Sequence, residues 1–172
     1  MAHLQWKTYL KEFTFSGLMI FTVSYVGAST FRNYIGYISV IDGSSMTPTF
    51  NPSGKSEDYV FFSTWAIRHY EIKRGDVVAF THPRKPATFL IKRVIALEGD
   101  RISTSSKYPC IIIPKGHCWV EGDGRNSLDS NIFGPIALGL IVGKASRIVW
   151  PYKRWKKVES FLPQTNLKSK NY

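Results

Sequence analysis

The longest uncharged stretch of this chain runs from Phe13 to Phe31. As an α-helix, its nineteen residues would rise roughly 28 Å, close to the ~30 Å hydrocarbon core of a bilayer. Small and hydroxylated residues dilute its hydrophobicity, which is typical of a span that packs against a partner helix. We therefore expect one transmembrane anchor helix over residues 13–33, preceded by a short tail of residues 1–12.

Two other interpretations of this stretch remain open. A cleaved secretory signal would also carry early lysines, an apolar run and small residues such as those at 26–28. A buried core helix is the second alternative. Lys7 and Lys11 favour an N-terminus that stays on the side of insertion, with the rest of the protein across the membrane.

After Arg32 the pattern changes to short runs rich in Val, Ile, Phe, Tyr and Trp, separated by Gly, Pro, Asn or Ser. The runs are Tyr37–Asp42, Asp58–Ser63, Asp76–Thr81, Ala87–Leu97, His117–Glu121 and Leu140–Trp150. No strong amphipathic helix separates them, so the pattern predicts a mainly β fold, an antiparallel sheet or barrel. We expect this β-rich domain over residues 37–150 and a basic tail over residues 151–172.

The chain has a formal net charge of +11, and residues 153–172 hold six Lys or Arg against one Glu. Such a balance favours polyanionic partners, either nucleic acid or an anionic bilayer surface. Because no recognisable RNA- or DNA-binding module occurs, we expect the lipid bilayer and no nucleic acid as a partner. The spacing of Cys110 and Cys118 matches no common zinc site, and whether they form a disulfide stays open.

Ser45 lies in a Gly/Ser/Pro turn, and Lys92 lies in an apolar strand. A serine hydroxyl becomes a good nucleophile only when a base takes its proton. The four histidines, His3, His69, His82 and His117, have no local setting that marks one as that base. A lysine buried in a sheet face can act near pH 7–8 if its pKa falls by about 3 units. The alternative is a strand lysine whose amine reaches solvent.

Four segments, in this order, resemble the sequence boxes of type I signal peptidases. They are residues 43–50 (GSSMTPTF), 74–80 (RGDVVAF), 92–100 (KRVIALEGD) and 122–130 (GDGRNSLDS). Any one of them alone could be an ordinary turn or strand, whereas the ordered set over roughly residues 39–142 is specific.

The resemblance implies a β-sheet or barrel domain of the signal peptidase type (peptidase family S26) that acts as a serine endopeptidase with a Ser/Lys dyad. It implies Ser45 as nucleophile, with its backbone N–H facing the oxyanion, and Lys92 as general base. No metal or organic cofactor is implied. The further residues it implies are Ser127, which orients the lysine amine; Asp123, Asp129 and Arg93, which brace the site; Asp76, in a structural turn; and Met46 and Ile41, which contact substrate.

The last box is one residue shorter than the family pattern and departs from it at two positions. Gly124 stands where Asn is usual, and Asn131 replaces a terminal Arg, so a salt bridge from Asp129 to that arginine cannot form. In the first box, Gly43 occupies a position where some members use a Ser hydroxyl as an oxyanion donor. These changes concern the bracing network more than the Ser/Lys pair.

The small size and the stretch 116–123 look most like the mitochondrial inner membrane peptidases of this family. That likeness implies a single-pass protein of the mitochondrial inner membrane whose catalytic domain faces the intermembrane space. It would cut sorting (signal) peptides from imported precursors beside a related peptidase subunit 1, as a heterodimer. The alternatives are a bacterial-type signal peptidase I and a catalytically silent, membrane-anchored partner subunit.

Overall fold

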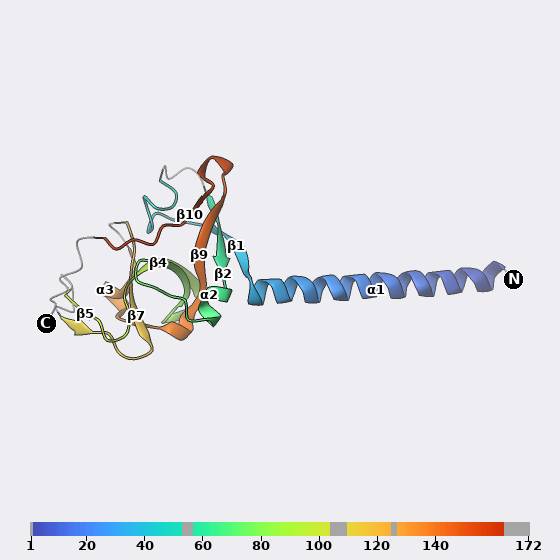
Figure 1. Ribbon diagram of the computed structural model, residues 1–172. Coiled ribbons are helices and arrows are strands. Elements are labelled where there is room, and N and C mark those ends of the chain that lie inside the picture. The colour runs from blue at the N-terminus through green and yellow to red at the C-terminus, as the bar shows by residue number, and fades with distance from the viewer. Residues whose placement is uncertain (1, 53–56, 104–109, 125–126, 164–172) are drawn as a thin grey trace. The chain divides into compact units, whose positions relative to one another are not determined.

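The computed structural model describes residues 2–52, 57–103, 110–124 and 127–163. The chain divides into two compact units, residues 1–35 and residues 36–172. The first is a single helix, α1 (Ala2–Tyr34), and the second contains the sheet (Figure 1). The box residues Arg125 and Asn126 and the end of the tail, 164–172, lie outside the described residues.

Within α1, Glu12–Tyr34 is long and apolar enough to cross a membrane. This segment has 23 residues and a mean hydropathy of 1.2, and none of its span window is buried. Length and composition therefore fit the expected anchor. The hydroxyl of Thr22 donates to the carbonyls of Leu18 at 3.0 Å and Met19 at 2.9 Å, which satisfies a polar group inside the apolar stretch.

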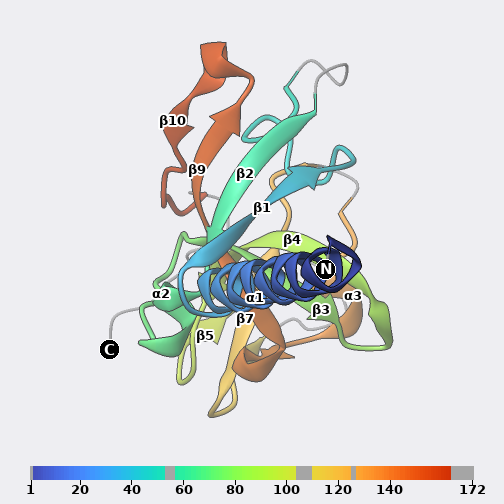
Figure 2. The same ribbon diagram turned by 90° about the vertical axis from the view of Figure 1, so that its right-hand side faces the viewer.

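The second unit is built on one eight-stranded antiparallel sheet, counted over the described residues, in the order β1-β2-β9-β3-β4-β7-β8 with β10 beside β9. Its strands are β1 (Gly36–Ile41), β2 (Asp58–Ser63), β3 (Val77–His82), β4 (Lys85–Ala96), β7 (His117–Glu121), β8 (Ile136–Ala137), β9 (Ile141–Trp150) and β10 (Lys156–Lys157). In Figure 2 the β10-β9-β2-β1 part stands above the β3-β4-β7 part. The two-residue strands β5 (Arg101–Ile102) and β6 (Ile111–Ile112) form a separate pair.

The predicted mainly β, antiparallel fold is confirmed. The strands β2 and β7 begin and end at the predicted residues, and β1, β3, β4 and β9 differ by one or two residues at their ends. The sequence pattern did not indicate the short helices α2 (Trp65–Arg68) and α3 (Ser130–Phe133) or the 3₁₀ turns η1 (Leu138–Leu140) and η2 (Tyr152–Arg154). Segments of three or four residues are too short to show a helical period.

Two of the three buried clusters of the described residues cover different parts of the sheet, and β3 and β9 contribute to both. One cluster gathers apolar side chains of β1, β2, β3 and β9, including Val60, Phe62 and Ile148. The other gathers β3, β4, β7 and β8, including Phe80 and Val120. The first residues of β4 are exposed and its last five are buried. The buried part of β4 begins at Lys92, so a lysine stands at the point where this strand becomes part of the core.

Residues 151–163, expected as part of a basic tail, pack against the sheet. β10 pairs with β9, and Val158 is only 6% exposed in the first cluster. The backbone N–H of Val158 donates to the carbonyl of Ser146 at 2.9 Å. Both cysteines are free thiols, Cys110 exposed and Cys118 buried, and burial raises the pKa of the Cys118 thiol to about 12.

Candidate active site

Ser45 lies in a tight loop that leaves the end of β1. The loop turns at Gly43, whose φ of +84° favours glycine, and a hydrogen bond from Thr47 N–H to Ser44 O of 3.1 Å closes the next turn. The far end of the loop is tied back by Asn51, whose side-chain amide donates to the carbonyl of Ile41 at 2.7 Å. Ser45 is therefore held at a half-buried position by contacts on both sides of it.

Lys92 reaches Ser45 from β4, 47 residues further along the chain. Its amine nitrogen Nζ lies 2.7 Å from Ser45 Oγ and 2.9 Å from the backbone carbonyl of Ile91. The residue is only 2% exposed. The alternative of a strand lysine whose amine reaches solvent is therefore excluded. The structure brings the two residues at the centre of the sequence hypothesis into direct contact.

Burial is the main influence on the charge of Lys92. It disfavours the ammonium form and lowers the pKa of the amine from 10.5 to about 8, although the negative charges of Asp129 and Asp123 act in the opposite direction. A substantial fraction of the amine is then neutral at mildly alkaline pH. A neutral amine has a free lone pair, which can accept the proton of the Ser45 hydroxyl.

Ser127 lies close to the nucleophile loop but makes no hydrogen bond to the lysine. Its hydroxyl is buried and, among the described residues, has no hydrogen-bond partner, so the predicted bond to Lys92 is not formed in this structure. Its position is nevertheless close to the nucleophile loop: a Cβ added to Gly122 would meet Ser127 Oγ at 2.1 Å and the carbonyl oxygen of Ser45 at 2.5 Å. Gly122 is thus the residue that lets these two groups approach.

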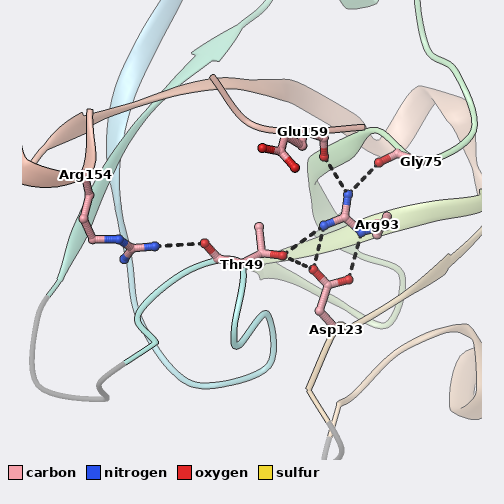
Figure 3. Close-up of polar contacts among 6 residues, drawn as sticks. All are labelled: Thr49, Gly75, Arg93, Asp123, Arg154 and Glu159. Atoms are coloured by element: carbon pink, nitrogen blue, oxygen red, sulfur yellow. Dashed lines mark hydrogen bonds and ion pairs between the residues drawn. The ribbon is translucent and has the colours of Figure 1, made fainter. Parts of the chain in front are cut away.

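Arg93, the neighbour of Lys92, is fully buried at 0% exposure and makes a two-point ion pair with Asp123. Nε donates to one carboxylate oxygen at 2.9 Å and Nη2 to the other at 2.7 Å. Thr49 joins the pair, because its hydroxyl accepts from Arg93 at 3.1 Å and donates to Asp123 at 2.5 Å (Figure 3). The predicted bracing partners Arg93 and Asp123 therefore act on each other and on the loop that carries Ser45.

Asp129 braces a different part of the site. Its carboxylate caps α3 by accepting from the backbone N–H of Asn131 at 3.1 Å, and it accepts from the N–H of Gly122 at 3.3 Å. The side-chain amide of Asn131 also donates to it at 3.1 Å. A neutral amide thus occupies the place of the arginine usual in the family, and the cap holds the last box without an ion pair there.

Comparison with known proteins agrees with this geometry. The family described as "Signal peptidase, peptidase S26" matches residues 12–111 and 103–150, which is more than half of the chain. The chain belongs to this signal peptidase family. It is accordingly a serine-type peptidase, and the resemblance that the four boxes indicate is confirmed.

Among curated proteins, the peptidase is similar to the mitochondrial inner membrane protease subunit 2 of several organisms. It is 44% identical to the mouse protein over 83% of each chain. It is 43% identical to the human protein over 94% of this chain and 91% of the relative. It is also 41% identical to the human mitochondrial inner membrane protease subunit 1, over 69% of this chain and 72% of that one.

Two residues expected to bind substrate do not face an open surface of the peptidase. Ile41 and Met46 are each 2% exposed and belong to the core cluster that also contains Phe50. Their apolar side chains anchor the two arms of the nucleophile loop in the core. Contact of these two residues with substrate stays a prediction.

Sequence reasoning missed several polar contacts that support the fold around the site of the peptidase. Asp76, expected as a turn residue, is bonded to Lys144 at 2.7 Å and to the hydroxyl of Ser160 at 2.5 Å. Asp58 is buried, pairs with Arg154, and accepts from the N–H of Asn51 at 2.8 Å. The sequence did carry one signal for these contacts, namely a carboxylate at the start of an apolar strand, because a buried acid needs a partner. The partner's identity depends on tertiary contacts.

Proposed function

We propose that this chain is a membrane-anchored Ser/Lys endopeptidase that removes sorting peptides from proteins directed to the mitochondrial intermembrane space. The observation that carries the proposal is the 2.7 Å contact between Lys92 Nζ and Ser45 Oγ, made by a lysine that is 2% exposed. The mitochondrial part of the proposal rests on the names of the mouse, human and yeast relatives.

In the first half of the reaction the neutral amine of Lys92 takes the hydroxyl proton of Ser45 while Oγ attacks the scissile carbonyl carbon. The carbonyl oxygen becomes an oxyanion and is stabilised by the backbone N–H of Ser45, which has no intramolecular acceptor among the described residues. The ammonium of Lys92 then gives its proton to the leaving amine. The peptide bond breaks and an ester to Ser45 remains.

In the second half a water molecule replaces the departed amine. Lys92, neutral again, removes a proton from this water as its oxygen attacks the ester carbonyl. Collapse of the second tetrahedral intermediate returns the proton to Ser45 Oγ and releases the new carboxyl terminus. The low pKa of Lys92, about 8, supports both proton transfers, since the amine has to alternate between its two forms in each half.

We propose that α1 remains in the inner membrane and that the β-rich unit faces the intermembrane space. Anchoring would hold the enzyme in the same bilayer as its tethered precursors, which raises their effective concentration. A related subunit 1 is the proposed heterodimer partner, and the 41% identity to the human subunit 1 supports two such chains of common design. Small residues in the span would allow close packing with a partner helix.

The test is cleavage of a purified precursor that carries an inner-membrane sorting peptide, followed by mass spectrometry of the products. The full chain is assayed in detergent, alone and together with subunit 1. We expect one defined cut that Ser45→Ala and Lys92→Met each abolish, with both variants still folded. Turnover by folded Lys92→Met would overturn the lysine-base mechanism. Cleavage that needs subunit 1 and survives Ser45→Ala would instead support the silent-partner alternative.

The anchor is tested separately in intact mitochondria. A retained anchor predicts that the mature chain keeps the residues before Ala28 and resists extraction by alkaline carbonate, whereas a cleaved signal predicts their loss. Protease added after the outer membrane is ruptured should digest the β-rich unit. Protection of that unit until the inner membrane is dissolved would contradict the proposed orientation.

A further inference from the structure

Residues 154–161, here called the C-terminal strap, are used by no step of the proposed reaction, yet they lie against the site. The strap is fixed to the sheet by β10 and by the buried side chain of Val158. Its last residues then cross the turn before β3, where the backbone of Phe161 lies 2.9–3.0 Å from the place that a Cβ on Gly75 would occupy. Gly75 also has a φ of +88°, so both space and conformation require glycine there.

The strap completes the surroundings of Arg93. All five guanidinium N–H groups are bonded, and the carbonyl of Glu159 is one of their acceptors, at 3.0 Å from Nη1. The ring of Phe161 covers the guanidinium, with its centroid 3.9 Å from Cζ. A cation over an aromatic face is attracted most strongly where water is excluded, and Arg93 has 0% exposure.

The strap also contacts Thr49 directly. Arg154 donates to the backbone carbonyl of Thr49 at 3.1 Å, while Arg93 donates to its hydroxyl at 3.1 Å (Figure 3). Arg154 is held in turn by the buried carboxylate of Asp58. Thr49 is therefore fixed at two atoms by two arginines, and the strap supplies one of these arginines and covers the other.

Both contacts lead to the dyad. Arg93 follows Lys92 in β4, and Thr49 is four residues after Ser45 in the nucleophile loop. We propose that the C-terminal strap positions the catalytic pair, with Phe161 as a positioning residue that holds Arg93 and thereby keeps Lys92 buried beside Ser45. This inference rests on the proposed role of Lys92 as general base.

Loosening the strap should change the protonation of Lys92 as well as the geometry. If Arg93 moves, the charge of Asp123 is less neutralised and water reaches the amine, and both effects favour the ammonium form. The charged groups on the elements around the amine are Asp123 and Asp129 after β7, Glu121 at the end of β7, Arg93 on β4, and the Asp76–Lys144 pair of the β3 and β9 side. Loosening the strap thus acts on Lys92 through Arg93 and Asp123. The activity at a given pH falls, and a higher pH is needed for the activity to rise.

The experiment compares Phe161→Leu with Phe161→Tyr in the full chain, assayed with its partner subunit in detergent over a range of pH. Phe161 is 46% exposed, so folding should survive. We expect Phe161→Leu to lower kcat about tenfold at neutral pH. We also expect the midpoint of its acid limb to rise by about half a pH unit, with KM little changed. Phe161→Tyr keeps an aromatic face and should retain the wild-type profile.

The matched control is Trp155→Leu, which removes another exposed aromatic side chain from the same strap, 60% exposed, and should leave the profile unchanged. Wild-type kcat and midpoint in folded Phe161→Leu, or the same defect in Phe161→Tyr, would overturn the inference. If Phe161→Leu does not fold, Phe161→Met replaces it under the same criteria. Cleavage at the wild-type rate by folded Lys92→Met would refute the proposed function itself. Failure of the proposed function and failure of the inference about the strap are thus distinguishable.

Discussion

A Cβ atom on Gly124 would lie 2.6 Å from the carbonyl oxygen of Ser44, the residue before the proposed nucleophile. The backbone N–H of Gly124 donates to the carbonyl of Ser45 at 3.0 Å, so the last box crosses the nucleophile loop at hydrogen-bond distance. The family usually has Asn at this position. In this chain the shortened box brings the backbone so close that a side chain has no room, which gives the departure a steric reason.

Gly124→Ala should therefore displace the nucleophile loop. We expect kcat to fall about a hundredfold, because a shift of about 1 Å in a catalytic group has an effect of this order. Gly139→Ala is the control, since a Cβ there meets nothing within 4 Å. The measurement is precursor cleavage by each folded variant, and equal rates for the two variants would contradict the steric argument.

The rate of cleavage should rise with pH and reach half of its maximum near pH 8. The reason is that Lys92 acts as a base only when neutral, and its pKa is lowered to about 8 by burial. The pH dependence of kcat/KM between pH 6 and 10 reports this ionisation in the free enzyme. A rate that is constant from pH 7 to 9 would show that another group limits the reaction.

The same buried amine should make the folded protein less stable at neutral pH. Its pKa is about 8 when folded and 10.5 when unfolded, so the unfolded chain binds more protons between these values. Stability contributed by this group therefore rises as the pH increases from 8 to 10.5 and is lowest below pH 8. Lys92→Met should raise the Tm at pH 7 and reduce its increase toward pH 10. A lower Tm at pH 7 would contradict this sign.

The sequence allowed the larger part of the sheet to be predicted, because long runs of β-branched and aromatic residues between turn residues have few alternatives. The Ser45–Lys92 contact could be predicted only because four boxes occur in order. The strap could not, since the bond from Arg93 to Glu159 joins residues 66 apart and its acceptor is a backbone carbonyl that any residue provides. Charge pattern alone indicated a solvated or lipid-facing segment for Arg154, which instead pairs with buried Asp58.

Ser127→Ala should separate catalysis from stability. The Ser127 hydroxyl is buried and has no partner among the described residues, so its removal should leave the free energy of unfolding unchanged or raise it by about 1 kcal/mol. Cleavage should fall if this hydroxyl orients the Lys92 amine once substrate is bound. Ser130→Ala is the contrast: Ser130 Oγ accepts from Val120 N–H at 3.0 Å, and its loss should destabilise by about 1–3 kcal/mol. Full activity in Ser127→Ala would remove that residue from the mechanism.

Two arginines of this chain make the same two-point contact with an aspartate in opposite environments. Arg93 pairs with Asp123 at 0% side-chain exposure, and Arg74 pairs with Asp100 through Nε and Nη2, each at 2.7 Å, at 48% exposure. Lysine cannot reproduce the planar fork in either place. At the buried site Arg93→Lys leaves acceptors unpaired. We therefore expect the free energy of unfolding to fall by about 3–5 kcal/mol and cleavage activity to be lost. At the surface Arg74→Lys should cost about 0–1 kcal/mol, because water replaces the lost bonds.

Urea unfolding of the full chain in detergent, followed by tryptophan fluorescence, measures both values. A fall in the free energy of unfolding above about 2 kcal/mol in Arg74→Lys, or below about 1 kcal/mol in Arg93→Lys, would contradict the argument from burial. Burial decides the difference, since the number and length of the contacts with the aspartate are nearly the same in the two pairs. At the buried pair beside the dyad water cannot replace a lost bond, which is why we propose that the strap covering Arg93 helps to hold Lys92 in place.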